Sequence, residues 1–489
     1  MRDGRFAAAS SGGSIHITAL ITDPSSPDLR RRPSQVRLGL ASTLALLTAG
    51  CLSLAGCGAL DYSSRLDKEE ALVAGLRPGG ADLLLPPKES LARGEQEEAA
   101  EAALSGAPTL ERVVEIALRR NPSLHATLER WAEALGRPAQ ASSYAFPTLT
   151  YRSSRVVRLH GVSLTQVVPF PGKLTLQGEV ALELAGAARY DYAAQRNTLR
   201  ALAANLYYGL YLRRQERRIL QDNVELLARF VEISRALYAA GLVEQADVLK
   251  AEVERSTLRA EEARVAGEVR AAVAALNTLL DRSTVAPVGS VSDPEPKAGG
   301  EDLEALFAQA LDQRPEIDAA LSRAASADAA VSRARLSYLP DFVFGGGYSR
   351  SRRLDSGGGT AQVGVILPIW LGRIAGEVDE AKARARRTRF EIEGVRNQVL
   401  QEVEQAAARQ EAARQRIRIL EEEAVPQARQ AIDVSEAAYQ AGKIEFLSLI
   451  DAERLLLAAE LARYRALADY GARTADLERA IGRPQEATE

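Results

Sequence analysis

The chain has 489 residues and a formal net charge of −3, and 46% of its residues are apolar although only 5% are aromatic. This composition, rich in alanine, leucine, glutamate and arginine, is typical of long helices. Because acidic and basic residues are interspersed along the chain, we expect no basic face and therefore no nucleic-acid partner.

The N-terminal 57 residues are interpreted as an export signal of the lipoprotein type. Arginines at positions 30, 31, 32 and 37 precede the apolar run 38–47, which is followed by small residues. The string Leu54-Ala55-Gly56-Cys57 resembles a bacterial lipobox, so we predict that Cys57 is lipidated and begins the mature chain. Residues 1–29 are interpreted as an over-extended gene start or a passive extension of the signal.

This signal is expected to send the chain to the outer membrane. The residue after Cys57 is Gly58 rather than Asp, which in bacterial lipoproteins favours onward transport to that membrane. The alternative is an uncleaved inner-membrane helix, since residues 38–60 are long enough to span a bilayer. Cys51 and Cys57 are the only cysteines, so neither a disulfide framework nor a cysteine metal cluster is expected in the body of the chain.

Beyond the signal, the chain repeats one long pattern. Four motifs of the first half recur in the second, at a spacing that rises from 193 to 201 residues: Asn121-Pro122 with Arg314-Pro315, Phe146-Pro147 with Leu339-Pro340, Val168-Pro169 with Leu367-Pro368, and Tyr238-Ala-Ala-Gly241 with Tyr439-Gln-Ala-Gly442. A repeat of this length is a duplicated structural unit rather than a solenoid module. The expected divisions are a tether with one short helix (58–108), a first repeat (109–282), a linker (283–302), a second repeat (303–484) and a short polar tail (485–489).

Each repeat is expected to open with a helix and to continue as a β-hairpin. In the first repeat Thr109 is the expected N-cap, and a helix break is expected at residues 136–138. The apolar period then falls to two, and apolar residues alternate with polar or small ones in four short runs, at Leu149 and Tyr151, Val162 and Leu164, Phe342 and Phe344, and Val363 and Val365. We therefore expect strands of roughly 9–10 residues, the length that crosses a bilayer as tilted strands.

A very long helix is expected after each hairpin, over residues 174–239 and 374–440, so that each would extend about 100 Å. Their core positions alternate by four and three, as in a coiled coil: Leu220, Val224, Leu227, Val231, Ser234 and Tyr238 in the first, and Val425, Ala428, Ile432, Ser435 and Tyr439 in the second. Pro426 is expected to kink or re-register its helix. Gly241 and Gly442 are expected to end the long helices in left-handed turns, after which second helices return over 243–281 and 444–481.

The expected fold is mainly α with a small β part: two tandem repeats of long antiparallel coiled-coil helical hairpins, with four transmembrane strands per chain. Four strands cannot close a barrel, and an open sheet edge in lipid is costly, so several chains would have to pool their strands. Three chains would supply 12. The alternative is an ordinary soluble hairpin packed on helices in each repeat.

The duplicated layout and the segments after each Tyr-x-x-Gly resemble the TolC family of bacterial outer-membrane efflux proteins over residues 109–484. These segments read Val-Glu-Gln-Ala-Asp247-Val-Leu and Ile-Glu-Phe-Leu-Ser-Leu-Ile-Asp451-Ala-Glu. The string Val-Pro-Phe-Pro-Gly172-Lys173 is similar to the CzcC-type branch, which belongs to heavy-metal efflux systems of the RND type. The resemblance implies a homotrimer, with a 12-stranded barrel in outer-membrane lipid and an α-helical tunnel in the periplasm.

The resemblance also implies a gate at the lower end of the tunnel, where Gly241 and Gly442 would form the helix-tip turns. In the family, a Tyr and an Arg of the second repeat bond to an Asp of the first repeat and hold the entrance shut. Tyr439 matches that Tyr and Asp247 matches that Asp, whereas Ile444 stands where the Arg would be.

Acidic residues that ring the aperture are only partly kept in this sequence. Asp451 matches one of the family's two inward-facing acids, and Ser448 replaces the other. Without the resemblance, Asp247 would be interpreted as compensating a helix dipole and Tyr439 as a coiled-coil core residue. The resemblance favours roles for Asp247, Tyr439 and Asp451 in the gate and the aperture.

The sequence carries no motif for catalysis or for a resident metal. The three histidines, His16, His125 and His160, have no pair at metal-ligand spacing. The Gly172-Lys173 string lacks the first glycine and the Ser or Thr of a phosphate-binding loop. We therefore predict neither an enzyme nor a cofactor.

The predicted function is a passive exit duct of a tripartite efflux system, lipid-anchored in the bacterial outer membrane and extending into the periplasm. An inner-membrane RND-type pump and a periplasmic adaptor (a membrane fusion protein) would deliver the substrates, and heavy-metal cations are the favoured cargo. Alternatives are a duct for drugs, other small toxicants or secreted proteins. From a different class, the chain would be a periplasmic coiled-coil adaptor or scaffold.

Overall fold

The computed structural model describes residues 60–76, 101–102, 104–155, 159–296, 302–352 and 356–482. The predicted lipidation site, Cys57, and the tail 485–489 lie outside these residues. The chain divides into two compact units. The strand unit comprises Met1–Gly75, Arg130–Ala188 and Ala319–Ile392, and the helical unit comprises Leu76–Glu129, Arg189–Asp318 and Glu393–Glu489.

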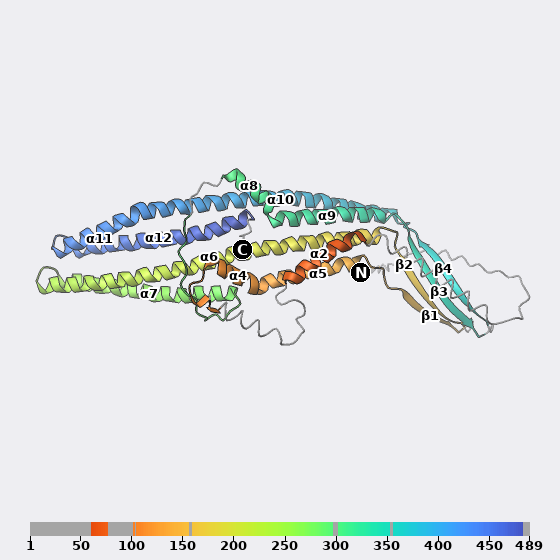
Figure 1. Ribbon diagram of the computed structural model, residues 1–489, viewed down its shortest axis with the longest axis horizontal. Coiled ribbons are helices and arrows are strands. Elements are labelled where there is room, and N and C mark those ends of the chain that lie inside the picture. The colour runs from red at the N-terminus through yellow and green to blue at the C-terminus, as the bar shows by residue number, and fades with distance from the viewer. Residues whose placement is uncertain are drawn as a thin grey trace, which may run out of the picture. The chain divides into compact units, whose positions relative to one another are not determined.

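The strand unit contains a four-stranded antiparallel sheet with the order β1-β2-β3-β4 (Figure 1). The first repeat supplies β1 (Thr148–Ser154) and β2 (Leu159–Val168), and the second supplies β3 (Asp341–Ser351) and β4 (Ser356–Ile366). β2 pairs with β3 along its whole length, from Leu159 opposite Ser351 to Val168 opposite Phe342. The two predicted hairpins are therefore confirmed, and this pairing joins both repeats in one sheet.

The sheet has one apolar face and one polar face. Because directly opposite residues point to the same side, the strand register fixes the members of each face. The apolar face carries the alternating residues singled out from the sequence: Leu149, Tyr151, Val162, Leu164, Phe342, Phe344, Tyr348, Val363 and Val365. The polar face is lined mostly by Thr, Ser, Gly and Gln. Among the described residues this face stays largely uncovered, since Leu149 is 70% exposed and Val363 is 65% exposed.

Gly347 permits the close pairing of β2 with β3. A Cβ atom at this position would lie 2.7 Å from the carbonyl oxygen of Val162 and 3.0 Å from the Cβ of Ser163. A larger residue would therefore push apart the two strands that join the repeats.

The expectation that no basic face forms is wrong at the loop ends of the hairpins. The β2–β3 register sets His160 opposite Arg350. Arg155 and Arg352 directly follow β1 and β3, and all four side chains are exposed. Arg155 and His160 belong to the first repeat, and Arg350 and Arg352 belong to the second. Only the pairing of β2 with β3 brings these residues together.

An ion pair joins the two repeats where the strands meet the helices. Lys173 Nζ lies 2.7 Å from Asp341 Oδ1 and also donates to the carbonyl oxygen of Leu339 at 2.8 Å. The same Asp341 Oδ1 accepts a hydrogen bond from the backbone N–H of Phe170 at 2.8 Å. Lys173 begins its helix and Asp341 begins β3, so the pair ties the start of β3 to the end of the first hairpin.

The helices of the strand unit are α2 (Leu60–Leu76), the later part of α5 (Pro122–Ala141), α9 (Pro315–Leu336), and the first parts of α6 (Lys173–Ala239) and α10 (Leu371–Ile419). Small side chains allow close packing of α9 against α10, where Ala327, Val331 and Ala385 form a buried cluster. None of the described helices combines the length and the apolar composition that spanning a membrane requires.

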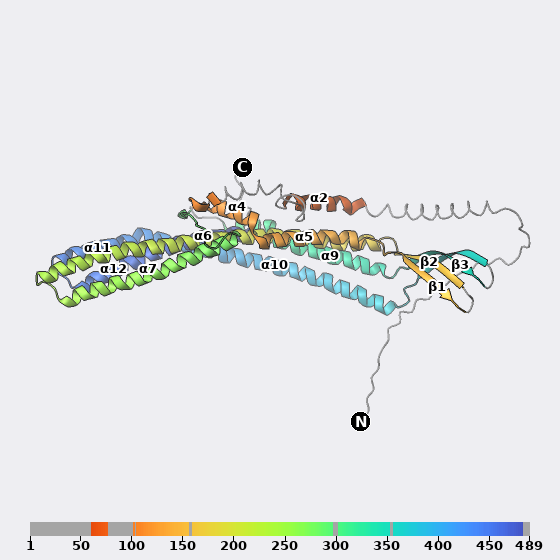
Figure 2. The same cartoon turned by 90° about the horizontal axis from the view of Figure 1, so that it is seen from below.

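The helical unit contains α4 (Leu110–Arg120), the start of α5, α7 (Gln245–Leu279), α8 (Leu303–Gln313), the π-helical turn η2 (Leu420–Ala424), α11 (Val425–Gln440) and α12 (Phe446–Ala480), besides the later parts of α6 and α10. α6 runs beside α7, and α11 beside α12, in both views (Figures 1 and 2). The predicted long helices and returning helices are confirmed to within a few residues. Pro426 stands in the first turn of α11, directly after the π turn, so the predicted change of register is confirmed.

The start of the first repeat holds one confirmed prediction and one that is wrong. Thr109 caps α4, as predicted. The break predicted at residues 136–138 is absent, because α5 runs through Pro138, which stands in its last turn and costs a single backbone hydrogen bond there. The chain breaks instead at Asn121, whose Oδ1 accepts the backbone N–H of Leu124 at 3.2 Å.

In each repeat, the residue before the second helix reaches back to the end of that repeat's last helix. Asn121 Nδ2 donates to the carbonyl oxygen of Leu279 at 2.9 Å. At the aligned position, Arg314 donates to the carbonyl oxygen of Ala480 at 3.0 Å. The equivalent contacts explain why the Asn121-Pro122 and Arg314-Pro315 motifs recur.

The beginning of the predicted linker is fixed against α6. The hydroxyl of Tyr207 donates to the carbonyl oxygen of Pro108 at 3.0 Å and accepts the backbone N–H of Ser292 at 2.8 Å. Arg214 donates to the carbonyl oxygen of Val288 at 2.6 Å. The connection between the repeats is thus held by side chains of α6 over residues 288–292.

Candidate functional site

The two helical hairpins of the helical unit end in turns of the same geometry. Gly241 has a φ of 73° and Gly442 a φ of 67°, which confirms the predicted left-handed turns. The N–H after each glycine closes a wider loop, from Leu242 to the carbonyl oxygen of Leu237 and from Lys443 to that of Ala438, both at 2.9 Å. The N–H groups of Gly241 and Gly442 themselves donate to the carbonyl oxygens of Tyr238 and Tyr439, both at 2.9 Å. The two bonds at each turn form the Schellman motif, which fixes the angle at which α7 and α12 leave the turns.

Tyr439 links the second repeat to the first. It is 1% exposed, and its hydroxyl lies 3.0 Å from Ser234 Oγ of α6. Its ring meets the ring of Phe446 edge-on, with 5.6 Å between the centroids. Burial raises the pKa of Tyr439 above its ordinary value, and the negative charge of Asp247 raises it further. The hydroxyl is therefore neutral at any physiological pH and serves as a hydrogen-bonding group.

Asp247 lies in the first turn of α7, close enough to influence Tyr439 through its charge. Its Oδ1 accepts a hydrogen bond from Lys250 Nζ at 3.1 Å. Within the described part of the chain, the Tyr439 hydroxyl pairs with Ser234, and the Tyr–Asp bond implied by the resemblance is not formed among these residues. The gate roles of Asp247 and Tyr439 stay a prediction.

The Asp451 side chain on α12 is largely exposed and, among the described residues, makes only a long contact with Arg454. Its Oδ1 lies 4.0 Å from Arg454 Nη1, and its side chain is 62% exposed. Arg454 makes its closer contacts with Glu254 of α7, at 3.0 and 2.8 Å. Asp451 therefore keeps its carboxylate in solvent, as a residue that lines an aqueous aperture would.

The two positions that depart from the family's pattern have different surroundings. Ile444 packs partly buried against the apolar cluster at the turns. Ser448 is exposed and its backbone N–H donates to the carbonyl oxygen of Glu445 at 3.1 Å. An arginine in place of Ile444 would have to leave that cluster to reach a carboxylate.

The cluster that supports the turns draws buried residues from four helices, α6, α7, α11 and α12; we call it the tip cluster. Its members include five residues of the predicted seam and several residues of α12: Leu220, Leu227, Phe230, Val231, Ala251, Leu258, Val265, Ile432, Tyr439, Phe446, Leu449, Ile450 and Ala452. Tyr238, also predicted in the seam, is 48% exposed. Leu237 packs against the cluster instead, because the 3.6-residue period of the helix shifts the buried position by one residue near the end of α6.

Glu453 is a candidate that the sequence analysis missed. It is fully buried on α12, and neither carboxylate oxygen has a hydrogen-bond partner among the residues that the structure describes. Burial raises the pKa of Glu453 to about 7, and the nearby Glu254 adds to the rise. A signal was present in the sequence, since Phe446, Ile450 and Glu453 follow heptad spacing and a carboxylate there falls within the apolar stripe.

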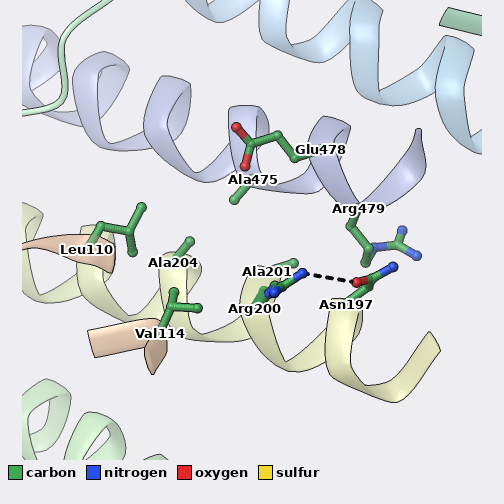
Figure 3. Close-up of a pocket in the computed structure, with 9 residues that line it drawn as sticks. All are labelled: Leu110, Val114, Asn197, Arg200, Ala201, Ala204, Ala475, Glu478 and Arg479. Atoms are coloured by element: carbon green, nitrogen blue, oxygen red, sulfur yellow. Dashed lines mark hydrogen bonds between the residues drawn. The ribbon is translucent and has the colours of Figure 1, made fainter. Parts of the chain in front are cut away.

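A small cavity lies between α4, α6 and α12, and Figure 3 shows the side chains around it. Its volume is about 20 Å³. Arg200 Nη1 donates to Asn197 Oδ1 at 3.5 Å beside it. A space of this size holds about one water molecule, so the cavity is a packing feature and not a site for cargo. Among the described residues, no three His, Cys, Asp or Glu side chains are placed to hold a metal ion.

The fold and the turns agree with a family match over both repeats. Residues 113–282 and 306–483 match the family described as outer membrane efflux protein, and the chain belongs to this family. The membership confirms the predicted outer-membrane location, the resemblance to the TolC family and the prediction that the chain is not an enzyme.

Similarity to individual proteins is more distant. The chain is 28% identical over 321 residues to the pyoverdine export outer membrane protein OpmQ of Pseudomonas aeruginosa, which covers 60% of each chain. The match therefore spans less than two thirds of the length of this relative. Two solved structures share the fold: CusC, with a TM-score of 0.67 and 19% identity over 76% of this chain and 92% of that one, and the Campylobacter jejuni CmeC outer membrane channel, with a TM-score of 0.67 and 16% identity over 76% and 85%.

Proposed function

We propose that the protein is the passive exit duct of a tripartite efflux system in the outer membrane. The observation that carries this proposal is the four-stranded sheet. It has an exposed apolar face, and its outer strands β1 and β4 leave two open edges. Open edges are costly in lipid, so the sheet of one chain needs the sheets of other copies to close a barrel.

A homotrimer satisfies this requirement. Three copies would supply 12 strands, each apolar face would contact lipid, and the polar face lined by Thr, Ser, Gly and Gln would line the channel. The described residues provide no machinery for coupling to an energy source, so a pump in the inner membrane, of the RND type, and a periplasmic adaptor (a membrane fusion protein) would drive the transport. A periplasmic coiled-coil scaffold would need neither the apolar face nor the open edges.

The oligomeric state tests the duct against the scaffold. The protein extracted from outer membranes in detergent should run as a heat-modifiable trimer, and the purified trimer should conduct ions in planar bilayers. A soluble monomer without conductance would refute the duct proposal and favour the scaffold.

For the cargo, heavy-metal cations are supported by the residues that lead into α6, Val-Pro-Phe-Pro-Gly172-Lys173, which resemble the CzcC-type branch. The lack of a high-affinity metal cluster among the described residues is compatible with this cargo, because a duct needs only to let ions pass. The similarity to OpmQ favours a second candidate, a small organic molecule.

A sensitivity panel on a deletion strain separates these cargoes. Zinc, cobalt, cadmium, copper and silver salts would be tested beside drugs and detergents. Selective hypersensitivity to metal salts, restored by the gene, is expected for the metal duct. A profile limited to drugs would discard the metal assignment and keep the duct.

Asp247 and Tyr439 are proposed to hold the duct closed. The Tyr439–Ser234 contact ties α11 to α6, and a hydrogen bond of this kind contributes about 0.5–1.5 kcal/mol. The double variant Asp247→Ala with Tyr439→Phe should therefore raise the open population, and with it the conductance, by roughly 2- to 12-fold. Tyr238→Phe, which removes a hydroxyl from the exposed tyrosine at the equivalent turn, is the matched control.

Planar-bilayer recordings of the three proteins check this expectation. If the double variant conducts like the wild type, or if Tyr238→Phe opens the channel equally, the proposed gate is wrong.

Cys57 is proposed as the lipid anchor. Replacing it by Ala should leave the precursor uncleaved and remove the acyl label from cells fed radioactive palmitate. Cys51→Ala, three residues before Leu54, should change neither. Retention of the acyl label in Cys57→Ala would show that the lipobox was misassigned.

A further inference from the structure

The loop ends of the two hairpins carry a strong positive charge. By sequence, residues 146–168 and 341–367 contain six arginines and two acids, Asp341 and Asp355, in a chain whose net charge is −3. Asp341 lies at the helix end, where it is occupied by Lys173. The pairing of β2 with β3 brings the loop ends of both hairpins side by side (Figure 1), so the described residues Arg155, His160, Arg350 and Arg352 collect at one end of the sheet.

Part of this charge lies on the apolar face. In the strand register, His160 and Arg350 face the same side as Tyr151 and Tyr348. They form the next layer of side chains on that face, two residues nearer to the loops. Tyr151 Oη lies 2.7 Å from His160 Nδ1, which fixes the aromatic and basic layers against each other. Along this face toward the loops, layers of Phe, Val and Leu side chains are followed by a layer with Tyr151 and Tyr348, and then by His160 and Arg350.

This order matches the layers that a membrane presents to a protein surface. Aliphatic side chains contact the hydrocarbon, tyrosines lie at the interface, and basic side chains reach the anionic headgroups. Arginine binds phosphate with good geometry, because its planar fork of N–H donors fits two phosphate oxygens.

We propose that these residues (Arg155, His160, Arg350 and Arg352, the basic rim) bind phosphate groups of lipids in the outer leaflet of the outer membrane. The basic rim anchors the loop end of the sheet at the headgroup level. This inference rests on the proposed insertion of the sheet in the membrane and adds that the loops face outward, and it does not depend on the cargo or on conduction.

The strand register supplies a matched control. Arg152 is opposite Gly161, which is opposite Ser349, so Arg152 lies on the polar face of the sheet. Arg152 and Arg350 are both exposed, and each carries one positive charge near the loops. Exchange of either for Gln removes the same charge, but only Arg350→Gln removes it from the lipid side.

The test measures lipid binding to the purified protein in a neutral detergent by native mass spectrometry. The probes are diphosphoryl lipid A, zwitterionic phosphatidylcholine and inorganic phosphate as a competitor. Wild type should bind lipid A more tightly than phosphatidylcholine, and inorganic phosphate at equal concentration should not displace it. Arg350→Gln should weaken lipid A binding about five-fold, and Arg152→Gln should leave it within about two-fold of wild type.

Several results would overturn the proposal. They are equal affinity for lipid A in Arg350→Gln and wild type, an equal loss in Arg152→Gln, and displacement of the lipid by inorganic phosphate, which would indicate a plain anion site. Unchanged heat-modifiable mobility of each variant verifies that it is folded. A protein that binds lipid A as expected but conducts no ions would refute the duct and leave the basic rim standing.

Discussion

As the pH rises from about 4.5 to above 7, the wild-type chain should lose about 3 kcal/mol of unfolding free energy that a Glu453→Gln variant does not lose. The reason is the fully buried carboxyl of Glu453, whose pKa is raised from 4.5 to about 7 by burial and by Glu254. A raised folded-state pKa means that the folded chain binds the proton more tightly than the unfolded chain. The stabilisation is therefore complete below pH 4.5 and is lost as the pH rises through 7.

The charged groups near Glu453 allow the expected pH dependence to be assigned to this residue. Glu254 of α7 and Arg454 of α12 are the charged groups that act on it, and these two pair with each other. Several other ionic groups on the neighbouring helices pair with one another: Glu232 and Arg235 on α6 with Glu252 on α7, and Arg429 on α11 with Glu460 on α12. Proton uptake by Glu453 is thus the main change expected inside the tip cluster.

Guanidinium denaturation in detergent at pH 5 and pH 8 measures the effect. Glu453→Leu should be more stable than wild type at pH 8, because an apolar side chain replaces a buried charge without a partner. Glu460→Gln, on the same helix but paired with Arg429 at the surface, is the control and should keep the pH dependence of the wild type. An equal pH dependence in Glu453→Gln and wild type would contradict a buried, titrating Glu453.

Arg314→Ala should destabilise the chain by about 3 kcal/mol, because it removes a buried guanidinium that bonds two partly exposed carboxylates and a backbone carbonyl. The Arg314 side chain is 4% exposed and lies 2.9 Å from Glu316 and 3.0 Å from Glu402. It also holds the end of α12 through the carbonyl oxygen of Ala480. Although burial by itself would raise the pKa of Glu402, the hydrogen bond and charge of Arg314 keep that pKa below its usual value.

The loss should be largest at neutral pH. A depressed pKa of Glu402 stabilises the fold above the unfolded-state pKa, and this contribution disappears as the pH falls through the folded-state pKa. The difference between wild type and Arg314→Ala should therefore narrow in acid. Arg384→Ala, which breaks an exposed pair with Glu380 on one helix, is the control and should cost less than about 0.5 kcal/mol. Equal denaturation midpoints for Arg314→Ala and Arg384→Ala would refute the structural role of Arg314.

Much of the fold follows from local patterns in the sequence. Period two between Pro147 and Pro169 gave the first hairpin, and the four-three spacing gave the coiled-coil helices. Gly241 and Gly442 marked the turns because left-handed backbone favours glycine. The break at Asn121 was not predicted. Gly and Pro at 136–138 are the better-known helix breakers, whereas the break at Asn121 depends on a side-chain cap.

The candidate site was only partly predictable. The predicted burial of Tyr439 is confirmed. Its hydrogen-bond partner, Ser234, depends on how α11 packs against α6. Glu453 carries a charge in an apolar stripe, which a heptad count alone could have flagged. The arginines of the basic rim gave no local signal, because each hairpin by itself holds only a few of them.

By itself, the sequence determined the duplication, the element types, the turns and the apolar face of each hairpin, because these depend on residue periodicity and on backbone preferences that act within a few residues. Only the tertiary structure decided what the repeats do to each other: the pairing of β2 with β3, the Lys173–Asp341 clamp, the burial of Glu453 and the gathering of the basic rim. These contacts join residues far apart in the chain, and their energies depend on burial and on distances that exist only once both repeats have folded together.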